Sequence, residues 1–152
     1  MEEEYIDAMR EHFATLAEEL EQLHQAALSP PGLGPLLYRA AERNLQLLTE
    51  ACIGIAKQRL KSRDSVVPSD ARKAFEKLRS LGYDDSDIPW NKVIGLRNAL
   101  VHDYLNLDDS IVAGIISRKE YQQLLEFAGK QLEDAAPAAK PCSGSDSDCS
   151  PP

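Results

Sequence analysis

The stretch RNALVHDY (residues 97–104) places five side chains with polar chemistry within eight positions, in a chain that has only three histidines. Near neutral pH a histidine can take a proton from a ribose 2′-hydroxyl or return one to a leaving 5′-oxygen. A fixed guanidinium can hold a phosphate through two hydrogen bonds and stabilise the charge of a pentavalent phosphorus. Arg97 and His102 therefore suit phosphodiester transfer without a metal ion, and Asn98 can donate a further hydrogen bond.

The same stretch lies within an apolar helical pattern, formed by Trp90, Val93, Ile94, Leu96, Leu100 and Val101. Arg97 and Tyr104 are seven positions apart and share one face of an ideal helix, whereas His102 is rotated from Arg97 by about 140°. Two arrangements can direct Arg97 and His102 to one phosphate. The helix can end or kink near His102, or two copies of the helix can meet in a homodimer. Asp103 can orient His102 or face solvent.

Hydrophobic spacing predicts helices along most of the chain. Steps of three and four positions predict a first helix, on which Ile6, Met9, Phe13, Leu16, Leu20 and Leu23 share a face. Pro30, Pro31 and Gly32 end it. A second helix is expected over about 35–60, with Leu37, Ala41, Leu45, Leu48, Cys52 and Ile55 on its apolar face.

The second half of the chain predicts shorter helices. Ser69 is expected to cap a helix over about 70–81, and Pro89 to open the helix that carries the motif. A short turn through Ile116 should follow, and then a capping box at Ser117–Glu120 before a last helix to about Asp134. The fold class is therefore all-α, an antiparallel up-down bundle of four to five helices over residues 1–134. Residues 135–152 are polar and rich in proline, and predict a disordered tail.

The charge of the chain is uneven. The formal net charge is −8, yet residues 39–79 carry ten basic and five acidic side chains, a local net charge of +5. The basic residues are densest in KQRLKSR, where Lys57, Arg59, Lys61 and Arg63 are candidate RNA contacts. Alternatively, the run is a solvated helix end that the helix dipole stabilises.

Several function classes are excluded by motifs that the sequence lacks. It contains no glycine-rich phosphate loop, no Cys-x-x-Cys pair and no serine nucleophile motif. Glu21 and His24 have the Glu-x-x-His spacing of di-iron bundles, but no second copy exists, so neither a metal site nor a cofactor is expected. No targeting signal or membrane-spanning run is found. Cys52 fits a core position in a reducing compartment, and a cytoplasmic location is expected.

The motif and its surroundings resemble a known family. GLRNALVHDY resembles the R-x4-H-x-Y motif of the HepT toxins, a branch of the HEPN superfamily (higher eukaryotes and prokaryotes nucleotide-binding), and it matches Arg97, His102 and Tyr104 with Asn98 after the arginine. The resemblance continues in AAERNLQLLTEACIGIAKQ, AFEKLRSLG and WNKVIGLRN, and covers about residues 5–133.

This resemblance implies an all-helical homodimer that cuts RNA without a metal, with arginine and histidine of both subunits near the dimer axis. It also implies a partner, a minimal nucleotidyltransferase of the MntA type. This antitoxin neutralises the toxin by transferring AMP to the motif tyrosine, here Tyr104. The alternative is a non-catalytic HEPN module that binds a nucleotidyltransferase or a nucleotide. In that module Arg97 and His102 would form an anion site or an interface.

Overall fold

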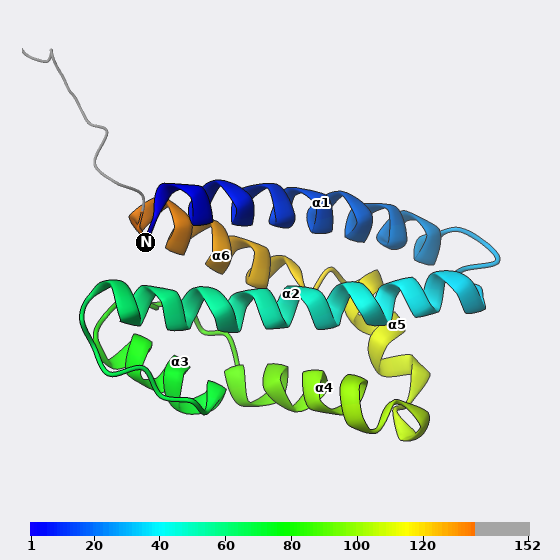
Figure 1. Ribbon diagram of the computed structural model, residues 1–152. Coiled ribbons are helices and arrows are strands. Elements are labelled where there is room, and N and C mark those ends of the chain that lie inside the picture. The colour runs from blue at the N-terminus through cyan, green and yellow to red at the C-terminus, as the bar shows by residue number, and fades with distance from the viewer. Residues whose placement is uncertain (136–152) are drawn as a thin grey trace, which may run out of the picture.

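A computed structural model describes residues 1–135 (Figure 1). These residues form a 3-10 turn, η1 (Tyr104–Asn106), and six α-helices and no strand: α1 (Glu3–Leu28), α2 (Pro35–Ser62), α3 (Ala71–Ser80), α4 (Trp90–His102), α5 (Asp109–Ser117) and α6 (Gln122–Ala135). The all-α prediction is confirmed. The helices exceed the expected four to five because the stretch predicted as a short turn forms α5. Except for Ala135, the predicted tail (135–152) lies outside the described residues.

Helix α2 is the centre of the bundle, because it packs against each of the other five α-helices. Its predicted apolar face is confirmed for Ala41, Leu45, Leu48, Cys52 and Ile55, which are all buried, whereas Leu37 near its start is 43% exposed. The seam of α1 is confirmed in the same way, with Ile6, Phe13, Leu16, Leu20 and Leu23 buried. Full burial of a leucine, isoleucine or phenylalanine side chain contributes about 1.5–3 kcal/mol, so the large side chains of these two faces stabilise much of the core.

Two predicted helix caps are wrong. Asp70, not Ser69, caps α3, because its side chain accepts a hydrogen bond from the backbone N–H of Arg72 at 3.0 Å. Ser117 does not open α6. It is the last residue of α5, and its hydroxyl donates to the carbonyl of Gly114 at 3.3 Å. The apolar run before Ser117 forms α5, so this serine ends a helix, and α6 begins at Gln122.

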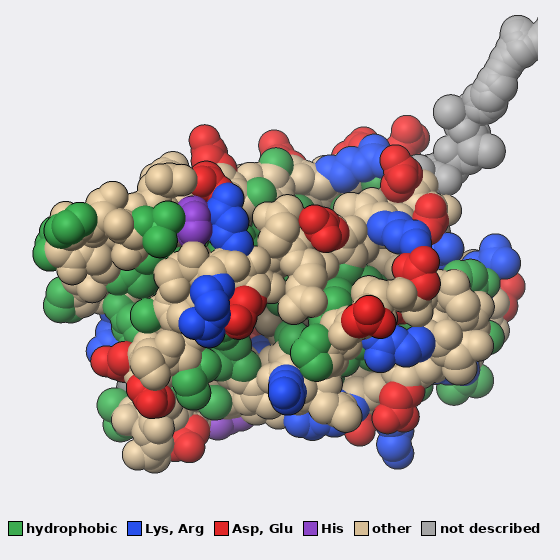
Figure 2. All heavy atoms as spheres, turned by 180° about the vertical axis from the view of Figure 1, so that it is seen from behind, with side chains coloured by type: hydrophobic (Ala, Val, Ile, Leu, Met, Phe, Trp, Pro, Cys, Tyr) green, Lys and Arg blue, Asp and Glu red, His purple; other side chains and the backbone are tan. Residues whose placement is uncertain are grey.

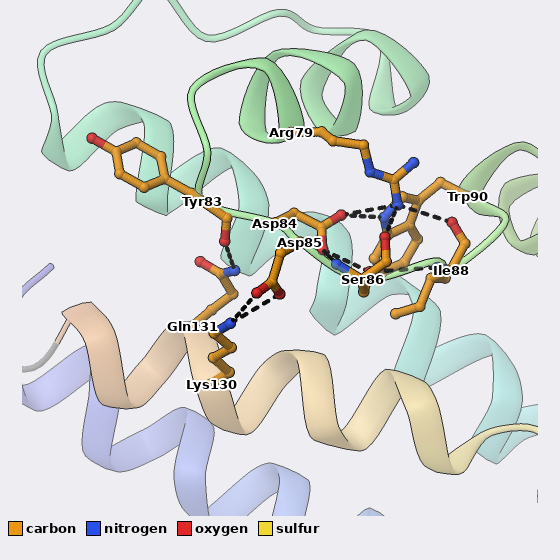
Figure 3. Close-up of polar contacts among 9 residues, drawn as sticks. All are labelled: Arg79, Tyr83, Asp84, Asp85, Ser86, Ile88, Trp90, Lys130 and Gln131. Atoms are coloured by element: carbon orange, nitrogen blue, oxygen red, sulfur yellow. Dashed lines mark hydrogen bonds and ion pairs between the residues drawn. The ribbon is translucent and has the colours of Figure 1, made fainter.

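A buried polar cluster connects α3 to α4 (Figure 3). The Asp84 carboxylate accepts hydrogen bonds from the Trp90 indole Nε1–H at 2.8 Å and from the Ser86 hydroxyl at 2.6 Å. Its second oxygen also lies 3.2 Å from Nη2 of Arg79. The Trp90 ring stacks on Phe75 with a centroid distance of 3.7 Å. These contacts fix the residue at which α4 begins, and thereby the position of the motif further along the helix.

Candidate active site

Helix α4 presents the motif at the margin of the bundle. Among the described α-helices its backbone lies close only to those of α2 and α3, and Trp90 at its start also packs edge-on against Phe127 of α6 with ring centroids 4.8 Å apart. Ile94 and Leu100 are buried and hold α4 on the core, whereas Arg97 and Asn98 are half-buried and His102 is exposed. The helix therefore combines an anchored apolar side with polar side chains that solvent or a ligand can reach.

Arg97 and Asn98 are brought into direct contact. Nε of Arg97 donates a hydrogen bond to Oδ1 of Asn98 at 2.9 Å. Among the side chains that the structure describes, which exclude that of Tyr104, this is the only hydrogen bond of the Arg97 side chain, and it uses neither terminal nitrogen of the guanidinium. A guanidinium oriented through Nε can offer Nη1 and Nη2 to an anion, and it loses less conformational entropy on binding than an unrestrained arginine side chain would.

His102 is the last residue of α4. The backbone leaves the helix at Asp103 (φ −146°, ψ 32°), and η1 begins at Tyr104. The helix thus ends at His102, as the first of the two arrangements requires. The Asp103 carboxylate accepts a hydrogen bond from the Asn106 amide at 2.6 Å, and none joins it to His102 in the described residues. For Tyr104 the structure describes the backbone and not the side chain.

The basic run that begins at Lys57 lies at the C-terminal end of α2, at the opposite end of the bundle from the C-terminal end of α4 (Figure 1). Most of its cations contact other parts of the chain. Lys57 donates to the Ser69 carbonyl at 2.8 Å, and Arg63 donates to the Tyr83 hydroxyl at 2.6 Å. Arg59 donates to the Gln131 carbonyl at 3.3 Å. Lys61 is exposed. The structure does not bring this run to the motif.

Glu21 and His24 join α1 to the α5 region. His24 Nδ1 lies 3.0 Å from the Ile116 carbonyl, and a Glu21 oxygen lies 2.7 Å from Nζ of Lys119. Hydrogen bonds from Lys119, which has the larger effect, and from Gln25 lower the pKa of Glu21. These side chains serve a structural contact between helices.

An apolar groove runs beside α4 and was not predicted from the sequence. It has a volume of about 240 Å³, and its apolar lining includes Val93, Leu96, Ile111, Ile115 and Leu124, from α4, α5 and α6. Other apolar side chains near the end of α4 are also exposed, Val101 by 38% and Leu105 by 82%. Figure 2 shows hydrophobic side chains at the surface on the left, the end that carries the α1–α2 turn. Periodicity indicates which apolar side chains share a helix face. It does not indicate which of these side chains remain exposed because no other helix packs on them.

Comparison with known proteins agrees with this architecture. A family model described as Ribonuclease HepT-like matches residues 3–130. The mRNA nuclease HepT of Shewanella oneidensis is 31% identical over 87 residues, which are 55% of this chain and 65% of that protein. The alignment thus spans less than two thirds of that relative. A chain from a solved structure, described as "Crystal structure of the toxin-antitoxin with AMP-PNP", shares the fold with a TM-score of 0.65. It is 24% identical, over 80% of this chain and 98% of that chain.

Proposed function

Because the chain belongs to the HepT-like ribonuclease family, we propose that it is a metal-independent RNA endonuclease in which Arg97 and His102 act on the scissile phosphodiester. One observation carries the proposal: α4 ends at an exposed histidine, and the half-buried arginine on the same helix is held through Nε by Asn98. The guanidinium thus keeps two terminal donors for a phosphate, and the imidazole is accessible to a ribose.

The reaction assigns a role to each side chain. The ribose 2′-oxygen attacks phosphorus, its proton passes to a base, and the 5′-oxygen leaves with a proton from an acid. The products are a 2′,3′-cyclic phosphate and a 5′-hydroxyl. His102 can serve as the base or as the acid. Arg97 holds the phosphate and stabilises the charge that develops on its oxygens, and Asn98 keeps that guanidinium in place.

Two copies of the chain would supply both proton-transfer groups. One imidazole cannot take one proton and give another in the same step, whereas a homodimer that pairs the ends of two α4 helices offers two. The uncovered surface of α4 and the apolar groove beside Val93 and Leu96 favour such a dimer. Burial of the exposed Leu105 and Val101 would stabilise it further.

The proposal includes control by a partner protein. A nucleotidyltransferase antitoxin of the MntA type would transfer AMP to Tyr104, two residues after His102. A bulky, negatively charged adenylate at this place would block the site and repel the RNA backbone. The fold is shared with a chain from a toxin–antitoxin structure, which supports a partner of this kind. We place the pair in the cytoplasm, where RNA is available. No helix within residues 1–135 has the length and apolar character needed to cross a membrane.

The catalytic roles can be tested with the purified chain, total RNA and EDTA. His102→Ala and Arg97→Ala should each lower the cleavage rate by about 100-fold or more while the oligomeric state stays unchanged. His12→Ala and Arg43→Ala are matched controls, because both residues lie outside the motif, on α1 and α2. Cleavage by His102→Ala at the rate of the unmodified chain would show that the catalytic assignment is wrong.

The regulatory part has a separate test. Co-expression with a nucleotidyltransferase of the MntA type should add an adenylyl group to the peptide that contains Tyr104 and stop cleavage. Tyr104→Phe should remain unmodified and active in the same cells. If the unmodified chain neither cuts RNA nor gains mass, Arg97 and His102 belong to a binding module, the alternative that the sequence left open.

A further inference from the structure

A second groove lies between α3 and α4, near the start of α4, and it shares Pro89 and Lys92 with the lining of the apolar groove. It has a volume of about 590 Å³, and its charged lining consists of Arg72, Arg79, Lys92 and Glu76. Helix α3 is itself basic, with four cations and one carboxylate in residues 71–80. An anionic ligand is therefore favoured at this place, although the whole chain has a net charge of −8.

Two of these cations are not used by the fold. In the part of the chain that the structure describes, the side chains of Arg72 and Lys92 have neither a hydrogen bond nor an ion pair. They differ in this respect from Lys57 and Arg63, whose charged groups bond to other segments. A cation without an internal partner can neutralise a ligand without first breaking a contact, so Arg72 and Lys92 are the better candidates for anion binding.

Arg79 is a third cation, held in a fixed position. Its Nη2 lies 3.2 Å from the Asp84 carboxylate and donates to the carbonyls of Ser86 and Ile88 at 2.9 and 3.1 Å. Figure 3 shows its other terminal nitrogen turned away from these partners. Asp84 offsets much of the charge of Arg79. The guanidinium can still donate a hydrogen bond from a position that the loop has already fixed.

The apolar side chains in the lining determine which part of a nucleic acid the groove can recognise. Phe75 and Trp90 are 2% and 4% exposed and stack on each other at 3.7 Å. Their faces are covered, so a base cannot stack on them, which is the contact that aromatic side chains usually offer to single strands. The groove offers mainly positive charge, and the ligand that fits it is a phosphate backbone.

We propose that the α3–α4 groove binds the backbone phosphates of the RNA substrate, through Arg72, Lys92 and Arg79, at the opposite end of α4 from the cleavage site. This inference rests on the proposed ribonuclease function and extends it by a substrate-binding surface. Lys92 lies ten residues before His102 on the same helix, about 15 Å along its axis. A bound strand of several nucleotides can span such a distance. Binding here is independent of base sequence, because no base is contacted.

The test measures RNA affinity in the His102→Ala chain, so that cleavage does not interfere. The probe is a fluorescein-labelled single-stranded RNA of about 20 nucleotides, titrated by fluorescence anisotropy over a series of salt concentrations. Arg72→Gln with Lys92→Gln should weaken binding about tenfold at low salt and reduce the salt slope by about 1.4, or 0.7 for each lost phosphate contact. In the active chain the same pair should raise KM and leave kcat unchanged.

The matched control removes the same charge elsewhere. Lys73→Gln with Arg10→Gln should change affinity less than about twofold, because Lys73 follows Arg72 on α3 but does not line the groove. Thermal unfolding of both double variants should match the parent chain. Equal losses of affinity in both pairs would assign the effect to overall charge, and the groove proposal would be wrong.

Three further outcomes distinguish this proposal from the function on which it rests. If the unmodified chain cuts RNA and the groove pair binds RNA as the parent does, only the groove proposal fails. If the Arg72→Gln, Lys92→Gln double variant loses binding to the nucleotidyltransferase but keeps binding to RNA, the groove is a protein-docking surface, and the groove proposal is equally wrong. If the unmodified chain neither cuts nor binds RNA, the proposed function fails and the groove proposal fails with it.

Discussion

The Asp84 carboxylate ties the end of α3 to the start of α4, and its removal should destabilise the whole bundle. Its side chain is 1% exposed. It accepts hydrogen bonds from Trp90 Nε1 at 2.8 Å, from the Ser86 backbone N–H at 3.0 Å and from the Ser86 hydroxyl at 2.6 Å. In Asp84→Ala the indole N–H loses its acceptor inside the protein.

The expected magnitude follows from these contacts. A buried donor left without an acceptor costs about 1–3 kcal/mol, and breaking a buried ion pair costs about 3–5 kcal/mol. The Arg79 side chain is 44% exposed, so water partly compensates its loss, and the ion-pair contribution should fall below that range. We therefore expect Asp84→Ala to lower the free energy of unfolding by about 3 kcal/mol, a large share of the roughly 5–15 kcal/mol of a typical domain.

Urea unfolding followed by circular dichroism measures this change. Asp85→Ala is the matched control, because Asp85 is exposed and pairs with exposed Lys130 at 2.9 Å, and its loss should be small. Trp90→Phe, alone and combined with Asp84→Ala, isolates the indole hydrogen bond in a double-mutant cycle, with an expected coupling of about 1 kcal/mol or more. The reasoning is refuted if Asp84→Ala unfolds at the same urea concentration as Asp85→Ala.

Two other side chains give predictions about reactivity and pH. Burial raises the pKa of the Cys52 thiol, which is 0% exposed. Iodoacetamide should therefore modify the Cys52 peptide only after unfolding, which mass spectrometry of digests can measure. Modification of the native chain would contradict this burial. Burial, and then the charges of Glu42 and Asp109, raise the pKa of Tyr38 to about 12. The unfolded chain ionises this phenol near pH 10, so its contribution to stability is present below about pH 10 and is lost between about pH 10 and 12. Urea midpoints of Tyr38→Phe should fall less steeply over that range than those of the parent, and equal slopes would exclude Tyr38 as the cause.

The sequence predicts best the elements whose information is local and periodic. The spacing from Ile6 to Leu23 locates α1, and the apolar positions around Cys52 locate the buried face of α2, because each residue of a helix face repeats the same signal. The start of α6 is predicted wrongly at the capping box Ser117–Glu120. A serine followed by a glutamate three positions later resembles a capping box, but Ser117 ends α5, and α6 begins at Gln122.

The candidate site likewise has a part that local sequence predicts and a part that depends on contacts between distant segments. Arg97, Asn98 and His102 are close in sequence, so a prediction of one helix was enough to bring them to one end of it. The α3–α4 groove depends on contacts between separate segments, such as Arg79 with the carbonyl of Ile88, which no periodicity encodes. Charge density alone favoured the run that includes Lys57. The charged groups of most of those cations donate hydrogen bonds to backbone carbonyls or to a tyrosine hydroxyl, and only the structure shows these contacts.

The N-terminal end of α4 contributes mainly to stability, whereas its C-terminal end carries the proposed catalytic histidine. At its N-terminal end Trp90 is 4% exposed and hydrogen-bonded to Asp84, whereas at its C-terminal end His102 is exposed and has no hydrogen bond in the described residues. Substitutions at the two ends should therefore have different consequences. Asp84→Ala should act mainly on stability and lower the temperature at which activity is lost. His102→Ala should abolish cleavage and leave the unfolding free energy within about 0.5 kcal/mol of the parent, as expected for an exposed side chain. If both variants lost stability and activity in proportion, the two ends of α4 would act as one unit, and the exposed histidine would be part of the packing that holds the helix.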